Sequence, residues 1–276
     1  MATMNREVER AAELARAAGA LVTSIRDQGI EALAVEAKPG DEPVTVADRA
    51  ANELIVAGLR TSFPADVIVS EESVVHDKAR LTAERVWYVD PIDGTKDFIR
   101  GEEGFSMMIG LCVGGRPLVG VVYQPTRDRL YWTTGTDGAW LTEGGAAPRR
   151  ITVSTVEDAT AIRMVASRSN RGPVLDQVKS ALRITDELAI GSIGLKLGLI
   201  AAGERDLYVN PWPKCKAWDT CAPEAILTAA GGVLTDTKGG PIRYDEEDMS
   251  RGRGLVASNG RIHDGVLARL GHLFPG

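Results

Sequence analysis

The chain has 276 residues, of which 44% are hydrophobic and 25% are charged, with a formal net charge of -6 and a pI near 5.3. This composition is that of an ordinary globular protein and excludes a disordered chain and a disulfide-rich scaffold. Lysines and arginines are scattered and form no basic stripe of the kind that tracks a phosphate backbone, which argues against polymeric nucleic acid as a partner.

The cysteines and the apolar runs indicate the compartment. Cys112, Cys215 and Cys221 lack close Cys-x-x-Cys spacing, which fits a reducing cytoplasm. Charged residues interrupt the N-terminus, so the apolar core of a secretory signal is not apparent. No uncharged stretch approaches the roughly 18 residues of a membrane span. We therefore expect a soluble, cytoplasmic protein without a membrane partner.

Two amphipathic helices are expected at the start of the chain. Apolar residues recur every three or four positions from Val8 to Ile25, and Gly29 can end this helix. A second helix begins near Thr45 and stops before Pro64.

Two short apolar runs follow, at residues 67–70 and 86–89. Both are too short for helices and rich in β-branched or aromatic residues, so we interpret them as neighbouring strands. The first strand leads into Glu71 and Glu72, and the second leads into Asp90. Acidic residues are therefore expected directly after the C-terminal ends of both strands.

The rest of the chain divides into two patterns. From residue 105 to 141 apolar runs alternate with turn signals, which predicts an antiparallel meander. After about residue 155 strands alternate with helices. The expected elements are strands near 164–166, 188–190 and 207–209 and helices near 174–182, 195–202 and 220–230. We expect an N-terminal half, 1–155, with most of the acids and a C-terminal half, 156–276, of α/β type, with a ligand cleft between them.

Two carboxylates lie within one stiff turn after the second strand. Asp90 and Asp93 flank Pro91, whose ring fixes its own φ and holds the preceding residue extended. Gly94 permits a positive φ, and Thr95 can start a helix. Ionised carboxylates this close repel each other, so a divalent cation between them is the economical explanation. Oxygen ligands favour Mg²⁺, Mn²⁺ or Ca²⁺ over zinc, and hydrolytic chemistry favours Mg²⁺.

Other acids have ordinary structural interpretations that local sequence leaves open. Asp48 follows Thr45 by three residues, as in a capping box. Asp219 precedes an Ala-rich helix as an N-cap, and Glu71 can be solvated charge at a strand end. Asp97 falls in the first turn of a helix, where it complements the dipole, and this is the interpretation we favour for it.

Together these motifs resemble the inositol monophosphatase superfamily, a group of Mg²⁺-dependent, lithium-sensitive phosphatases. The matching segments are 44–48 (VTVAD), 69–73 (VSEES), 90–95 (DPIDGT), 218–219 (WD) and 229–232 (AAGG), in the same order over essentially the whole chain. Within the superfamily, DGTKDFI is similar to the DGTKEF form of the 3'(2'),5'-bisphosphate nucleotidases of the CysQ type. Residues 166–170 (ASRSN) resemble their SRSH segment with Asn170 in place of histidine.

The resemblance implies an α/β (α+β) fold, a layered α/β/α/β/α sandwich, and a site with two Mg²⁺ ions and a third, weaker one. The implied metal ligands are Glu71, Asp90 and the Ile92 carbonyl for one ion and Asp90, Asp93 and Asp219 for the second, with Glu71 shared by the third. The implied catalytic residues, near the attacking water, are Asp48, Glu71 and Thr95. The candidate substrate contacts are Gly94, Thr95, Ser167, Arg168, Gly191, Ser192, Lys196 and Asp219. Arg168 or Lys196 would meet a non-reacting phosphate, with a surface ion pair and a solvated helix position as the respective alternatives.

The implied activity is removal of the 3'-phosphate of adenosine 3',5'-bisphosphate by metal-activated water, giving AMP and phosphate. Adenosine 3'-phosphate 5'-phosphosulfate is a further candidate substrate. The alternatives are an inositol monophosphatase or a fructose-1,6-bisphosphatase specificity, or a sensor that binds a phosphate ligand without catalysis. The sequence is compatible with a monomer or a homodimer.

Overall fold

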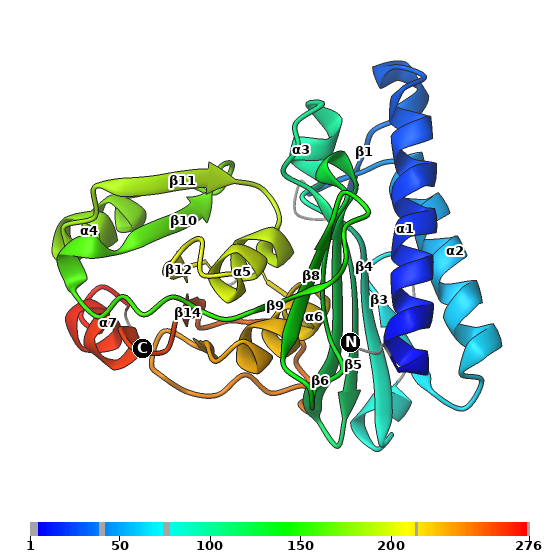
Figure 1. The fold of residues 1–276 in the computed structure, drawn as a ribbon. Helices are drawn as coiled ribbons and strands as arrows, with labels where there is room; N and C mark the ends of the chain where they lie inside the picture. The colour runs from blue at the N-terminus through cyan, green and yellow to red at the C-terminus, as the bar shows by residue number, and fades with distance from the viewer. Residues whose placement is uncertain (1–4, 39–41, 74–77, 213–214, 275–276) are drawn as a thin grey trace.

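Helical and sheet layers alternate through the molecule (Figure 1). The computed structural model describes residues 5–38, 42–73, 78–212 and 215–274. Its helices are α1 (Arg6–Arg26), α2 (Val46–Ser62), α3 (Thr95–Ile99), α4 (Pro173–Leu182), α5 (Ile193–Ala201), α6 (Ala217–Ala229) and α7 (His263–Leu270). None of the described helices is long and apolar enough to cross a membrane.

The larger sheet has the strand order β3-β4-β5-β6-β7-β8-β9 and is antiparallel except for the parallel pair β3 and β4. Its strands are β3 (Val67–Ser70), β4 (Arg85–Asp93), β5 (Ser106–Val113), β6 (Arg116–Gln124), β7 (Arg129–Thr133), β8 (Ala139–Glu143) and β9 (Arg149–Ile151). Helices α1 and α2 cover one face, because the apolar stripe of α1 that includes Val8, Ala15 and Val22 is fully buried against it.

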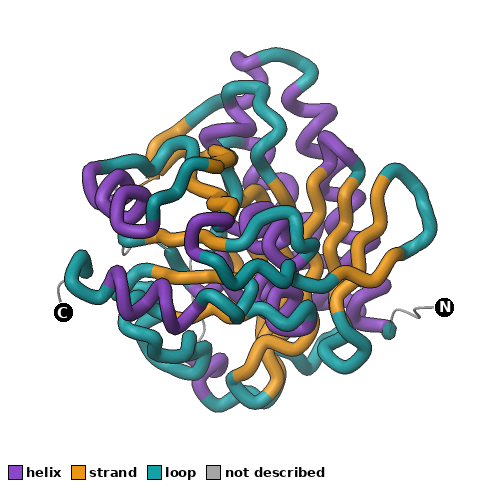
Figure 2. The backbone as a smooth tube through the Cα atoms, turned by 60° about the vertical axis from the view of Figure 1, so that its left-hand side comes forward, coloured by secondary structure: helices purple, strands orange, loops and turns teal. Residues whose placement is uncertain are grey.

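The smaller sheet has the order β11-β10-β12-β14-β13. Its strands are β10 (Arg163–Ser167), β11 (Asp186–Ile190), β12 (Leu207–Asn210), β13 (Val233–Thr235) and β14 (Leu255–Ser258), and a separate hairpin is formed by β1 (Glu36–Lys38) and β2 (Glu42–Val44). Helices α5 and α6 pack between the two sheets, and α4 and α7 cover the outer face of the smaller one. The strands of the two sheets run at a steep angle to each other in Figures 1 and 2.

The expected layered fold is confirmed, as are the two N-terminal helices, the neighbouring strands β3 and β4, the meander and the strand–helix alternation after residue 155. One expectation about the chain's course is wrong, because strand β4 does not stop at Asp90 but continues to Asp93. The sequence made no prediction of elements beyond residue 230, where the smaller sheet ends in an antiparallel pair, β13 with β14, followed by α7. The proposed boundary between the halves falls between β9 and β10, and the division itself stays a prediction.

Candidate active site

A register shift at the end of β4 turns two acids toward the interior of the molecule. Asp90 pairs with Met108 of β5, but Asp93 pairs with Ser106, so the ladder is irregular between them. Pro91 contributes to this because it has no N–H to donate to the ladder. Asp90 and Asp93 are both buried, with 2% and 9% of their surface exposed.

The turn after β4 requires glycine. Gly94 has a φ of +98°, and a Cβ at this position would lie 2.6 Å from the carbonyl oxygen of Gly104. Both the left-handed backbone and this close approach exclude a larger residue without rearrangement. The turn at Gly94 therefore determines that α3 begins at Thr95.

Asp48 caps α2 and also contacts Thr95, while its catalytic role stays a prediction. One oxygen, Oδ2, caps α2 by accepting the Thr45 N–H at 2.8 Å and the Thr45 hydroxyl at 2.6 Å. The other, Oδ1, accepts the Thr95 hydroxyl at 3.3 Å, and the same hydroxyl lies 3.1 Å from the Ile92 carbonyl oxygen. Burial raises the pKa of Asp48. The cap thus fixes an acid beside Thr95.

Glu71 reaches the same region from the end of β3. Its N–H donates to the Val89 carbonyl at 3.1 Å, and its carboxylate accepts the Lys38 ammonium at 2.9 Å. Lys38 also pairs with Glu72. Burial raises the pKa of Glu71 to about 7, against the lowering effect of Lys38. Lys38 was not anticipated, because its stretch of sequence has no periodicity.

The second half of the chain contributes Asp219 and the turn before α5. Asp219 accepts the Lys216 N–H at 2.6 Å, as an N-terminal residue of α6. Asp93 Oδ2 accepts the Ser192 hydroxyl at 2.7 Å and the Gly194 N–H at 2.9 Å. Asp93, at the end of β4 in the larger sheet, is therefore bound by the turn before α5 and the first turn of that helix.

These acids interact strongly with each other. The pKa of Asp90 lies well above its usual value because of burial and then the charges of Glu71, Asp93 and Asp219. The pKa of Asp219 is raised well above normal by burial and then by Asp93 and Glu71. Burial also raises the pKa of Asp93, although Lys196 lowers it. Such mutual repulsion is what a bound cation relieves.

The side chains of the acids described above do not converge on one point. Among the described residues, no three Asp, Glu, His or Cys side chains form a ready group around one ion. Glu71 is held by Lys38, and Asp93 is held by Ser192 and Gly194. The oxygen-only donor set nevertheless fits a hard cation such as Mg²⁺.

A cavity of about 400 Å³ contains most of the expected site. The expected residues on its wall are Glu71, Asp90, Ile92, Asp93, Gly94, Thr95, Ser167, Gly191, Ser192, Lys196 and Asp219. Asp48 lies behind Thr95 and is not on the wall. The wall also includes polar residues that were not anticipated: Glu42, Lys96, Ser169, Asn210 and Lys216.

Arg168 and Asp97 form a contact that the sequence did not predict. Arg168 is not on the cavity wall; its guanidinium lies 2.6 Å from Glu102 and 3.4 Å from Asp97. This is the ion pair that we had left as an alternative, so contact with substrate stays a prediction for Arg168. Asp97 is 1% exposed and accepts the Gly191 N–H at 3.0 Å, so it ties α3 to the second half besides lying in a first helical turn.

Lys196 is not a solvated helix residue. It is 2% exposed, and its ammonium donates to the Gly191 and Ser192 carbonyl oxygens at 2.7 and 2.9 Å. Burial lowers its pKa to about 8, although Asp93 opposes this shift. Its charge therefore lies at the base of the cavity.

Comparison with known proteins agrees with this geometry. A family model described as "Inositol monophosphatase family" matches residues 4–272 of this chain. The chain belongs to the inositol monophosphatase family. Members of this family are phosphatases that generally depend on Mg²⁺. The expected resemblance to the CysQ type is also confirmed. The 3'(2'),5'-bisphosphate nucleotidase CysQ of Escherichia coli K12 is 35% identical, over 91% of this chain and 99% of that protein.

Two further similar proteins have different names and show that related chains are assigned different substrates. A structure of CysQ from Bacteroides thetaiotaomicron is similar with a TM-score of 0.77 and 29% identity, covering 92% of this chain and 97% of that one. A protein named histidinol-phosphatase from Mycobacterium tuberculosis is 33% identical, over 86% of this chain and 88% of its own length. The fold and the phosphatase class are thus shared more widely than any one substrate.

Proposed function

We propose that this phosphatase removes the 3'-phosphate of adenosine 3',5'-bisphosphate and uses Mg²⁺. The observation that carries the proposal is the set of acids Glu71, Asp90, Asp93 and Asp219, which come from both halves of the chain and line one cavity beside Thr95. The cavity volume of about 400 Å³ lies within the range of small-molecule sites. The relatives named CysQ favour a nucleoside bisphosphate as the molecule that fills it.

The acids would hold two ions. Glu71, Asp90 and the Ile92 carbonyl would hold one, and Asp90, Asp93 and Asp219 the other, with a third, weaker ion on Glu71. Bound Mg²⁺ would supply a more nucleophilic water and would stabilise the charge of the leaving oxygen. The raised pKa values of Asp90 and Asp219 support this assignment, because bound cations would relieve the repulsion between carboxylates that contributes to these shifts.

The chain's own residues would orient the reaction. Thr95 and Glu71 would position the water in line with the 3'-phosphate, and Asp48 would hold the Thr95 hydroxyl. The amides of Gly94 and Thr95 are the expected donors to the phosphate oxygens. A bond would form from the water oxygen to phosphorus as the bond to the 3'-oxygen breaks. The water would give up one proton and the 3'-oxygen would take one up, so that AMP and phosphate are released.

A substrate panel in Mg²⁺ tests the proposal. It contains adenosine 3',5'-bisphosphate, its 5'-phosphosulfate analogue, inositol monophosphate, fructose 1,6-bisphosphate and, because of the relative of that name, histidinol phosphate. We expect the highest kcat/KM for one of the two nucleotides. Clear preference for any other ester would overturn the assignment. Binding without turnover of any substrate would support the sensor alternative, against which the retained Glu71, Asp90, Asp93, Thr95 and Asp219 weigh.

A further inference from the structure

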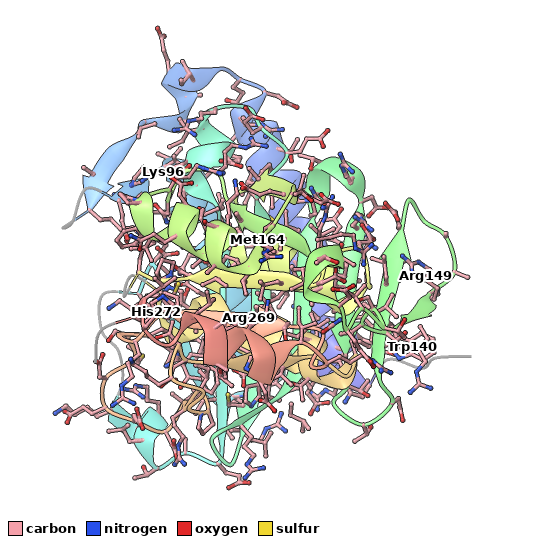
Figure 3. All side chains as sticks on the ribbon, turned by 90° about the vertical axis from the view of Figure 1, so that its left-hand side faces the viewer. Lys96, Trp140, Arg149, Met164, Arg269 and His272 are labelled. Carbon is pink, nitrogen blue, oxygen red and sulfur yellow. The ribbon has the colours of Figure 1, made fainter. Side chains whose placement is uncertain are left out.

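Lys96 is a cation on the cavity wall whose side-chain ammonium has no hydrogen bond or ion pair within the described ranges. It is exposed and belongs to α3, and Figure 3 labels it in the upper left of the view, above the helix α4 that faces the viewer. The other lysines on this wall are less exposed. Lys196 is buried and donates to two backbone carbonyl oxygens at 2.7 and 2.9 Å, and Lys216 is half-buried with its charge near that of Asp248. Lys96 is therefore available to an incoming anion.

The backbone holds Lys96 in a fixed place. Thr95, before it, directs its hydroxyl to the Ile92 carbonyl, and Asp97, after it, accepts the Gly191 N–H. Successive residues of a helix are rotated by about 100°. Lys96 therefore faces away from both of these anchoring contacts, and its side chain forms part of the cavity wall.

The charged groups of the cavity wall differ in exposure. Asp90 and Asp93 are buried and Asp219 is half-buried, and the proposed metal ions would neutralise these three acids. The exposed part of the wall carries Lys96, the carboxylate of Glu42 and neutral polar groups such as Asn170. The single phosphate of a monoester would bind among the buried acids and their proposed metal ions. A bisphosphate has a second phosphate, which would need a cation in the exposed part of the cavity.

We propose that Lys96 binds the non-reacting phosphate of a bisphosphate substrate and thereby selects bisphosphates over monoesters. The inference rests on the proposed nucleotidase function, and it assigns to Lys96 the contact that the sequence assigned to Arg168 or Lys196. A lysine acts on phosphate as a point charge, so arginine in its place would retain much of the contact.

The test compares adenosine 3',5'-bisphosphate with adenosine 3'-monophosphate, which lacks the second phosphate. Loss of one charge-assisted contact in Lys96→Gln raises KM for the bisphosphate about tenfold with little change in kcat. The loss on the monophosphate is much smaller, and Lys96→Arg recovers most of the bisphosphate affinity. The gap between wild type and Lys96→Gln narrows at high salt because the contact is exposed.

Lys78→Gln is the matched control, since Lys78 is exposed, pairs with Glu247 and lies off the cavity wall. It removes the same charge and should leave both KM values unchanged. Equal losses on both nucleotides in Lys96→Gln, or none, would overturn the role of Lys96 while wild-type turnover of the bisphosphate left the proposed function standing. Failure of the wild type to hydrolyse the bisphosphate would overturn both.

Discussion

The two walls of the cavity differ in how their side chains are held. On the first wall, Asp90 and Asp93 are buried at an irregular strand end, and neighbouring charges raise the pKa of Asp90. On the second wall, Ser167 is half-buried and Asn170 exposed, and the Asn170 N–H donates to the Ser167 hydroxyl at 3.1 Å. The acids of the first wall repel each other, whereas the second wall has neutral polar side chains that are partly or fully exposed to solvent.

This difference teaches where substitutions should matter for each property. Groups on the first wall are costly to the folded protein in the absence of cations, and proteins retain such groups where chemistry needs them. Substitutions of the exposed groups on the second wall should leave the buried acids of the first wall in place. We therefore expect turnover to depend on the first wall, and substrate choice to depend on the second wall and on exposed residues such as Lys96.

Asp93→Asn breaks the first wall and should have the largest effect. Asparagine retains the shape and still accepts the Ser192 hydroxyl and Gly194 N–H, but it removes a charge from the proposed metal site. We expect kcat to fall by about 10²- to 10³-fold or more, with the fold intact by circular dichroism. Asp137→Asn, an exposed change of equal charge, is the control. Unchanged phosphate release by Asp93→Asn would refute the role of Asp93.

Gly94→Ala should have the next largest effect, on both stability and turnover. The added Cβ would be strained at φ +98° and would lie 2.6 Å from the Gly104 carbonyl oxygen. Gly101→Ala is the matched variant, since Gly101 has a φ of +73° but nothing within 4 Å of an added Cβ. Left-handed strain alone should cost about 1–2 kcal/mol. Urea unfolding should show a larger loss for Gly94→Ala, and only this variant should lose activity; equal losses would contradict the close approach.

Magnesium should stabilise the protein more at pH 8 than at pH 5. The pKa of Glu71 is about 7 in the folded protein and 4.5 ordinarily, so the folded state binds more protons between these values. The free energy of unfolding contributed by Glu71 therefore falls as pH rises from 4.5 to 7. Magnesium at about 100 times its Kd would restore about 2.7 kcal/mol where the acids are ionised. Thermal unfolding with and without Mg²⁺ checks this; equal shifts in Tm at both pH values would argue against it.

Glu224 provides a way to separate the cavity acids from other buried acids. Burial raises its pKa to about 7 as well, and it accepts the Tyr244 hydroxyl at 2.5 Å, but it does not line the cavity. Glu224→Gln should reduce the pH dependence of Tm without changing the Mg²⁺-dependent part. A reduced Mg²⁺ shift in this variant would mean that the two groups of acids are coupled.

The sequence predicted most of the long elements, because their apolar period reflects burial on one face. It missed β1, β2, β9 and β13, each of three residues, since so short a segment carries no period. It made no prediction for β14 and α7. It also placed the end of β4 at Asp90, because Pro91 reads locally as a break, whereas the irregular pairing with β5 accommodates proline.

The candidate site was predicted unevenly. The motif around Asp90 and Thr95 is contiguous, so its geometry follows from one turn. The Lys38–Glu71 ion pair and the Asp97–Gly191 bond join segments that are distant in the chain, and no local pattern records such contacts. Asp48 shows the same limit, since the capping pattern was visible but the contact of its second oxygen with Thr95 was not.

The turn before α5 has a consequence for motion. Ser192 and Gly194 bind Asp93, and Gly191 binds Asp97, so three closely spaced residues join the two halves of the chain beside the candidate site. A hinge rotation of one sheet against the other would have to break these bonds first. Opening and closing around a ligand should therefore be confined to peripheral segments, and small-angle scattering profiles with and without the bisphosphate should superimpose.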